Sequence, residues 1–282
     1  MGIRKLLMIR PKEAPPKQES PLSLQLLLPK QIGISADRLV EPLHKLHPSL
    51  AQVRAEVRSG AIAPNVMQMG RVRWKHHVVQ ITLVDAPMVP EAMENTVAIS
   101  HYGDDLKTRA LAHVSHIVLL YRGEEKDPLE QYVALAMIAV GLVPLGAFVV
   151  VNASAYTSFP LQPLVPHAGG DVDKLLRSLP LPSLFVGFVT MQVVGWDGIW
   201  VRTCGAPLMN LPDLALHVRG TGEIAQTRDL FNAMLHTMRD VDTQFGEGDM
   251  VQDGDQNWML RRPRVNEQFL DSPRMLVLVP QH

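Results

Sequence analysis

Three segments with strand character follow one another between residues 184 and 220, and they constrain the fold more than any other stretch. Residues 184–194 form an apolar run rich in β-branched side chains, which is typical of a strand covered on both faces. The Asp-Gly pair at 197–198 is a strong hairpin signal, and residues 199–204 return as a second strand. Alternate residues between 214 and 218 are apolar, so a third strand with one buried face follows. We therefore expect the middle of a sheet here, with Trp200 and Phe188 in its core.

The rest of the chain mixes strands and helices. Strand patterns cover residues 22–28, 72–83, 117–121, 146–152 and 275–279, and helical patterns cover 39–57, 91–113, 127–140 and 223–245. Such mixed runs predict an α+β fold with mostly antiparallel sheets and helices on one face. A ferredoxin-like split βαβ in each half of the chain would account for the spacing.

Proline, glycine and charge divide the chain into four parts. Residues 1–20 are basic and then proline-rich, and we expect a flexible arm. Residues 21–152 form an N-terminal α+β half, and residues 153–183 form a proline-rich connector with one short helix. Residues 184–282 form a C-terminal α+β half that we expect to pack on the first.

Composition excludes several classes of function. The 282 residues are 46% hydrophobic and have a net charge of −1, so bulk electrostatics support neither a nucleic-acid partner nor a membrane surface. A single cysteine cannot form an internal disulfide, which fits a reducing cytosol. No apolar run has the length of a membrane span, and no cofactor motif is specific. We therefore expect a cytoplasmic protein without a cofactor.

Short sequence blocks occur in a characteristic order. They are AHVSHIV at 112–118, DPLE at 127–130, LPSLFVGF at 181–188, WVRTCG at 200–205 and LPDL at 211–214. With these blocks, residues 70 to 280 resemble an uncharacterised bacterial family, the domain of unknown function numbered forty-two sixty-one. This family has no established activity, so the resemblance implies relatedness and no reaction. Tyr is common in the family where this chain has Cys204, which disfavours Cys204 as a nucleophile.

Arg202 and Asp213 are the best place in the sequence to look for a site. Both belong to the predicted central sheet, and buried charges need partners. They form either a buried ion pair or the polar wall of a pocket that also includes Thr203.

His113 and His116 form an H-x-x-H pair at a predicted helix end. Side chains at i and i+3 share a helix face and could bind one metal ion, but no third ligand accompanies them. A His near a helix C-terminus also interacts favourably with the helix dipole. We favour that interpretation and predict no metal site.

Two functions from different classes remain open. The first is a non-enzymatic cytosolic module that binds another protein, of immunity, chaperone or adaptor type. The second is an enzyme or small-ligand-binding protein with a pocket near Arg202, Thr203, Asp213, His113 and His116. A concave pocket that holds several of these groups would favour the second.

Overall fold

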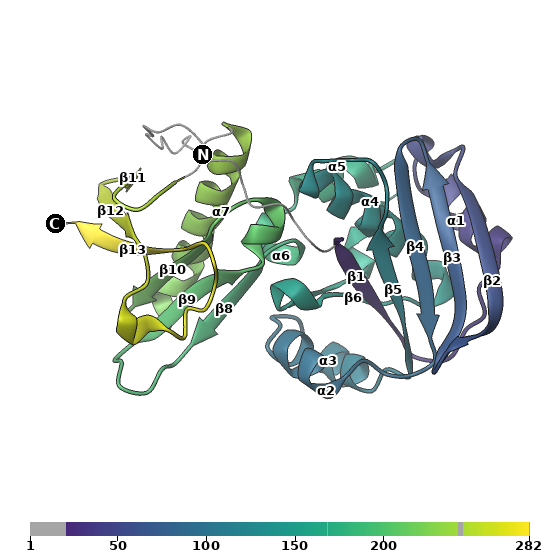
Figure 1. The fold of residues 1–282 in the computed structure, drawn as a ribbon, viewed down its shortest axis with the longest axis horizontal. Helices are drawn as coiled ribbons and strands as arrows, with labels where there is room; N and C mark the ends of the chain where they lie inside the picture. Colours follow the sequence, from purple (N-terminus) through teal and green to yellow (C-terminus); the bar gives the residue numbers. More distant parts are fainter. Residues whose placement is uncertain (1–20, 168, 242–244, 282) are drawn as a thin grey trace. The chain divides into compact units, whose positions relative to one another are not determined.

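The computed structural model describes residues 21–167, 169–241 and 245–281, apart from the side chains of residues 61 and 62. The predicted arm, residues 1–20, lies outside them. In the described part, residues up to Leu179 form one unit and residues from Pro180 onward form another (Figure 1). The expected packing of the C-terminal half on the N-terminal half stays a prediction. Among the described residues, no helix combines the length and apolarity that crossing a membrane requires.

The described part of the N-terminal unit has a seven-stranded sheet in the order β2-β3-β4-β5-β1-β6-β7, with every neighbouring pair antiparallel. Its strands are β1 Ser23–Leu28, β2 Arg54–Ala63, β3 Val66–Trp74, β4 His77–Val84, β5 Ser115–Tyr121, β6 Val149–Asn152 and β7 Thr157–Pro160. Its helical segments are α1 Ala36–Leu46, η1 Pro48–Leu50, α2 Pro90–Met93, η2 Glu94–Ala98, α3 Asp104–Leu111, α4 Pro128–Gly141, η3 Val143–Leu145, η4 Ala153–Ala155, η5 Gln162–Leu164 and α5 Val172–Ser178.

Helix α4 begins where the sequence predicts. The Asp127 carboxylate accepts a hydrogen bond from the Leu129 N–H (2.9 Å), and Pro128 occupies the first helical position. The helix is apolar almost all round and buried almost all round, as an internal helix must be. It covers one face of the sheet, where Asn152 of β6 donates to the Tyr132 hydroxyl (3.3 Å).

Helices also cover part of the opposite face. Leu27 of β1 and Val149 of β6 are register partners, and they pack with Met93 and Val97 of the α2–η2–α3 segment. These side chains point away from the face that holds Asn152, because successive strand residues alternate. The expectation of helices on one face is therefore wrong in detail for this sheet, although the α+β class is confirmed.

Strand β2 corrects the predicted helical pattern over residues 39–57. Helix α1 ends at Leu46, a short 3₁₀ turn follows, and the chain is extended from Arg54. Val53 and Val57 are four residues apart, a spacing that suits both a helix face and every second position of a strand. Pairing with β3 decides between the two.

The C-terminal unit has, in its described residues, a six-stranded sheet in the order β11-β12-β13-β10-β9-β8. Its strands are β8 Gly187–Met191, β9 Ile199–Cys204, β10 Asp213–Val218, β11 Met250–Asp253, β12 Gln256–Arg261 and β13 Met275–Gln281. Its helical segments are α6 Leu181–Leu184, η6 Ala206–Met209, η7 Thr221–Glu223, α7 Ile224–Asp240 and η8 Val265–Glu267. The β10–β13 pair is parallel, and the other pairs are antiparallel.

The predicted strand over residues 184–194 is shorter than expected and lies at an edge. Leu181 and Leu184 belong to α6, and β8 begins only at Gly187. Phe188 is half-buried and lies edge-to-face with Phe231 of α7 at 6.1 Å, whereas Trp200 of β9 is fully buried. A continuous apolar run does not distinguish a short buried helix from a strand, which explains the error.

The proline-rich segment 153–183 is not a separate connector. It contributes β7, which pairs with β6, and α5 to the N-terminal unit, and the boundary between the units follows Leu179. One split βαβ is present, because β5 and β6 are joined through α4 and β1 lies between them. In the C-terminal unit, β10 and β13 are direct neighbours, so two ferredoxin-like halves are not confirmed.

Candidate functional site

Arg202 lies inside the C-terminal sheet and is held by backbone carbonyls. Its guanidinium donates to Thr203 O (3.2 Å), Phe269 O (3.3 Å) and Asp271 O (3.0 Å). Only 8% of the residue is exposed. Its hydrogen bonds thus attach the segment before β13 to β9, and all three guanidinium nitrogens have a protein partner.

Asp213 is the centre of a second set of bonds at the start of β10. Its Oδ1 accepts from the Thr203 hydroxyl (3.0 Å) and the Ala206 N–H (3.1 Å), and its Oδ2 accepts from the Ser272 hydroxyl (2.7 Å). The Thr203 Oγ1 in turn accepts from the Leu214 N–H (2.8 Å). Burial raises the pKa of Asp213, and the three hydrogen bonds and nearby Arg202 act in the opposite direction.

These contacts describe an anchor between loops and sheet. The hydrogen-bonding groups of Arg202, Thr203 and Asp213 are directed at protein partners, as buried polar groups must be. Cys204 is buried beside them, and burial raises its thiol pKa to about 11, so the reactive thiolate is scarce at neutral pH. The arrangement stabilises the unit but offers no free nucleophile or base.

His113 follows the end of α3 and uses both ring nitrogens. Its Nδ1–H donates to Ala110 O (2.8 Å), and its Nε2 accepts from the Met88 N–H (2.7 Å). Burial lowers the pKa of His113, which keeps the ring neutral and fits this pattern of one donor and one acceptor. A metal ion would need one of the two occupied nitrogens.

His116 of β5 has a similar role. Its Nδ1–H donates to Ala86 O (2.7 Å), burial lowers its pKa, and its ring centre lies 6.5 Å from that of His113. Both rings thus hold the segment that leads from β4 to α2. Among the described residues, no three His, Cys, Asp or Glu side chains are grouped to hold a metal ion. The two histidines belong to the N-terminal unit and Arg202 to the C-terminal unit.

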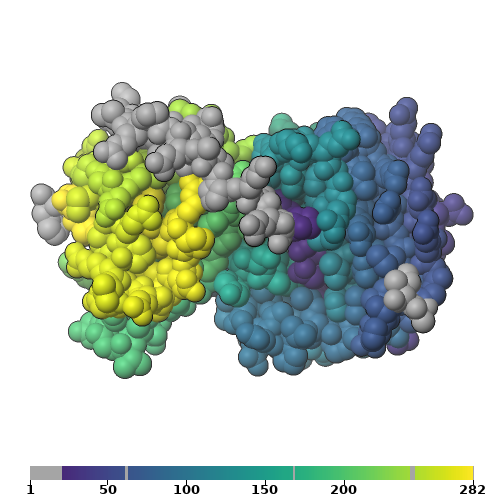
Figure 2. Space-filling view, in the orientation of Figure 1, coloured from purple at the N-terminus to yellow at the C-terminus, as the bar shows by residue number. Residues whose placement is uncertain are grey.

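A different feature of the N-terminal unit is a surface with several exposed arginines. It is one face of the sheet over β2, β3, β4 and the end of β5, outside the region covered by α2–η2–α3. Figure 2 shows the blue residues of β2, β3 and β4 at the surface of this unit. We name this surface the arginine face after its exposed cations, Arg54, Arg58, Arg71, Arg73 and Arg122.

The strand register brings these arginines together. Arg54 of β2 lies directly opposite Arg73 of β3, and Arg73 lies opposite Val78 of β4. Arg122, whose N–H donates to Val78 O (2.8 Å), continues this row beyond the end of β5. In antiparallel sheets, like charges that are directly opposite destabilise the pair. The position of Arg54 opposite Arg73 therefore does not stabilise the folded chain.

The cations of this face also lack ion-pair partners within the described residues. The other three arginines of residues 21–179 do have partners. They are Arg38, which donates to Gly33 O, Arg109, which lies 4.3 Å over the Phe148 ring, and Arg177, which bonds Asp173 and Glu130. Within the described part of residues 21–179, the guanidinium groups without a partner are thus on one surface.

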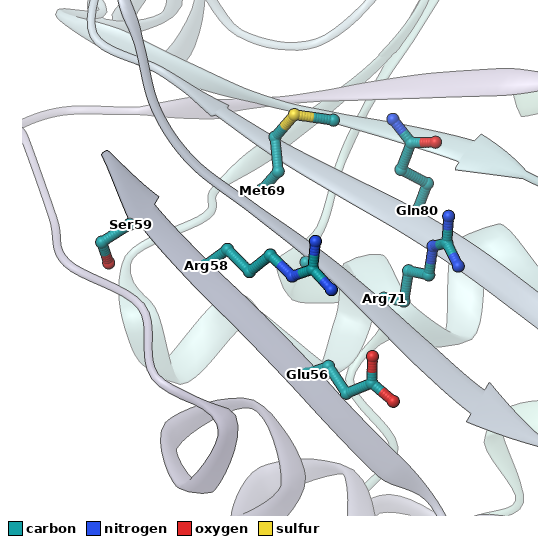
Figure 3. Close-up of a pocket in the computed structure, with 7 residues that line it drawn as sticks. Glu56, Arg58, Ser59, Met69, Arg71 and Gln80 are labelled. Atoms are coloured by element: carbon teal, nitrogen blue, oxygen red, sulfur yellow. The ribbon is translucent and has the colours of Figure 1, made fainter. Parts of the chain in front are cut away.

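A hollow of about 460 Å³ lies on this surface between β2, β3 and β4. It is lined by Glu56, Arg58, Ser59, Met69, Gly70, Arg71 and Gln80. Figure 3 shows Arg58 and Arg71 extending into the same space from neighbouring strands, with Glu56 below them. Two guanidinium groups, a carboxylate, an amide and one methionine thus line the same hollow.

Sequence reasoning missed this surface. Arg71 and Arg73 are in a predicted hairpin, but residues 54–58 were expected in a helix, so the facing strand was absent. The available signal was the period of two in Arg54-Ala55-Glu56-Val57-Arg58, which places both arginines on one side of a strand.

Comparison with known proteins gives no further guide. No protein-family model matches the chain, and neither a curated protein nor a solved structure matches it. The resemblance to the uncharacterised bacterial family stays a prediction.

Proposed function

We propose that the chain is a non-enzymatic, cytosolic protein-binding module of adaptor, chaperone or immunity type, with the arginine face as its docking surface. The observation that carries this proposal is the set of exposed arginines that form no ion pair with any described residue, two of them directly opposite one another. A partner that supplies negative charge removes this repulsion on binding, and exposed charge speeds association. The single buried cysteine is consistent with the cytosolic part of the proposal.

The alternative is an enzyme or a small-ligand-binding protein with a pocket near Arg202 and Asp213. Against it stands the hydrogen bonding of these residues, because their polar atoms are directed at Phe269 O, Asp271 O and Ser272. His113 likewise has both ring nitrogens bonded to the backbone. A substrate would have to displace these bonds before it could use the groups.

A comparative affinity purification tests the proposed docking surface. The unaltered chain, an Arg54→Gln/Arg73→Gln variant and an Arg219→Gln/Arg228→Gln control are each used to capture proteins from the native host, with quantitative mass spectrometry as readout. The control removes two exposed arginines from the C-terminal unit and changes the net charge equally. We expect at least one protein to be lost with the first variant and retained with the control. Identical capture by all three chains would contradict the docking surface.

A further inference from the structure

The five cations of the arginine face share one chemistry. Each is an arginine, whose planar guanidinium binds carboxylates through two parallel hydrogen bonds and is more weakly hydrated than a lysine ammonium. Guanidinium groups are therefore suited to a surface that exchanges water for anionic oxygens. Such groups suit anions that accept two parallel hydrogen bonds, which carboxylates and phosphates both do.

These charges are distributed over the sheet and do not converge on a point. Arg54, Arg73 and Arg122 follow one row across β2, β3 and the end of β5, and Arg58 and Arg71 occupy other rows. Neighbouring strands are about 4.8 Å apart, so the row from β2 to β5 spans roughly 14 Å. One compact anion cannot contact all of them, whereas an extended chain with several separate charges can.

Aliphatic side chains are interspersed among the arginines. Met69, Val78, Val118 and Leu120 are half-buried and belong to the same face by strand alternation. They offer contact to apolar side chains of a partner, which a protein segment has and a nucleic acid backbone lacks.

Aromatic side chains are missing from the described positions of this face. Trp74 and Tyr121 point to the opposite, buried side of the sheet. Single-stranded nucleic acids bind open sheets mainly by stacking bases on exposed aromatic rings. The surface therefore fits an acidic protein better than a nucleic acid.

Glu56 adds a further restriction. It lies between Arg54 and Arg58 along β2, directly opposite Arg71. Its carboxylate repels a doubly charged phosphate more strongly than single carboxylates that can be placed beside the arginines. The charge pattern thus favours Asp and Glu over a phosphorylated side chain.

We propose that the arginine face binds an extended acidic protein segment in which Asp or Glu alternates with aliphatic residues. This inference rests on the proposed function of the same surface and specifies the chemistry of its partner. The carboxylates bind the arginines in the rows, and the aliphatic residues contact Met69, Val78, Val118 and Leu120.

Fluorescence anisotropy with defined probes tests the proposal on the full chain. The main probe is a labelled peptide of about twelve residues, long enough to cross the face when extended, in which Glu alternates with aliphatic residues. A second peptide replaces every Glu with Gln, and a third probe is a labelled oligothymidine of similar length. Each is titrated against the unaltered chain, the Arg54→Gln/Arg73→Gln variant and the Arg219→Gln/Arg228→Gln control.

We expect the acidic peptide to bind the unaltered chain and the control equally, and about tenfold more weakly to the Arg54→Gln/Arg73→Gln variant. Its binding should also weaken near 1 M salt, where the Debye length is about 3 Å. Tighter or equal binding of the Gln peptide would overturn the proposal, and so would selective binding of the oligothymidine. Absence of binding by the acidic peptide would overturn it too.

Two checks keep this result interpretable. Circular dichroism of both variants verifies folding, and Arg122→Gln, which alters a residue beyond the end of β5, provides a second variant that should also weaken binding. If the native host partner is lost with Arg54→Gln/Arg73→Gln while the acidic peptide fails to bind, the docking surface stands and the acidic-segment inference fails. If capture from the host is unchanged, the docking surface itself fails.

Discussion

Arg202 and the arginines of the arginine face have opposite surroundings. Arg202 is inside the C-terminal sheet and donates to three backbone carbonyls, whereas Arg54 and Arg73 are exposed on the N-terminal sheet and face one another. Burying an unpaired charge costs several kcal/mol, so a buried arginine must acquire partners as the chain folds. An exposed arginine remains hydrated and can stay unpaired at small cost. Saturated buried polar groups therefore indicate a structural role, whereas exposed groups without a protein partner are explained by hydration alone and leave the proposed binding role to be tested.

The largest expected effect concerns the buried polar groups, whose hydrogen bonds are all made within the protein. Asp213→Ala removes the acceptor for the Thr203 hydroxyl, the Ala206 N–H and the Ser272 hydroxyl in a buried place. We expect a loss of about 3–5 kcal/mol in the free energy of unfolding, measured by denaturant titration. The matched control Asp197→Ala changes an exposed carboxylate and should stay within about 0.5 kcal/mol of the unaltered chain. Equal effects of both substitutions would show that the Asp213 bonds contribute little.

A smaller effect concerns a partly buried group in the same unit as the arginine face. His77 of β4 lies on the face of the sheet opposite the arginine face, where its Nδ1 forms a hydrogen bond with the Tyr121 hydroxyl (3.0 Å). Burial, followed by the charge of His76, lowers the pKa of His77 to about 4. The unfolded chain, with the ordinary His pKa of 6.5, takes up the proton first as the pH falls. The stabilising contribution is thus complete above pH 6.5 and is lost as the pH falls toward 4.

The measurement is thermal unfolding of the unaltered chain and of His77→Gln across this pH range. The stability difference between the two should shrink as the pH is lowered, because Gln has no proton to take up. A difference that is constant with pH would mean that His77 is as accessible to protons in the folded chain as in the unfolded one.

The smallest expected effect concerns the exposed arginines of the arginine face. Arg73→Gln removes the like-charge opposition to Arg54 and should leave the free energy of unfolding unchanged or raise it by up to about 0.5 kcal/mol. Its matched control, Arg71→Gln, removes a charge opposite Glu56 and should lower stability by a similar amount. A loss above about 1 kcal/mol for Arg73→Gln would assign Arg73 a structural role and weaken the contrast with Arg202.

Local sequence signals predicted many of the elements correctly. Asp127-Pro128 marked the start of α4, and the alternation around Val72 and Trp74 marked the β3–β4 hairpin. The alternation after Pro212 marked β10. These signals succeed because capping and strand alternation are determined by neighbouring residues.

Errors occurred where two structures fit the same pattern. Val53 and Val57 suit a helix as well as a strand, and the apolar run from Leu184 suits either a short helix or a buried strand. The sequence did point to Arg202 and Asp213 as polar residues of the central sheet, but it could not identify their partners. Those partners, such as Phe269 O and Ser272, are about sixty residues away along the chain, so only folding brings them together.

The sequence by itself thus determined the α+β class, the β3–β4 and β8–β9 hairpins and the start of the major helices, since these depend on residues close in the chain. Tertiary structure alone decided that β7 belongs to the first sheet and that β8 is an edge strand. It also decided that Arg54 faces Arg73 while Arg202 is enclosed by carbonyls. Strand register and burial are set by contacts between distant segments, and these contacts determine whether a charge is satisfied inside the protein or remains free at its surface.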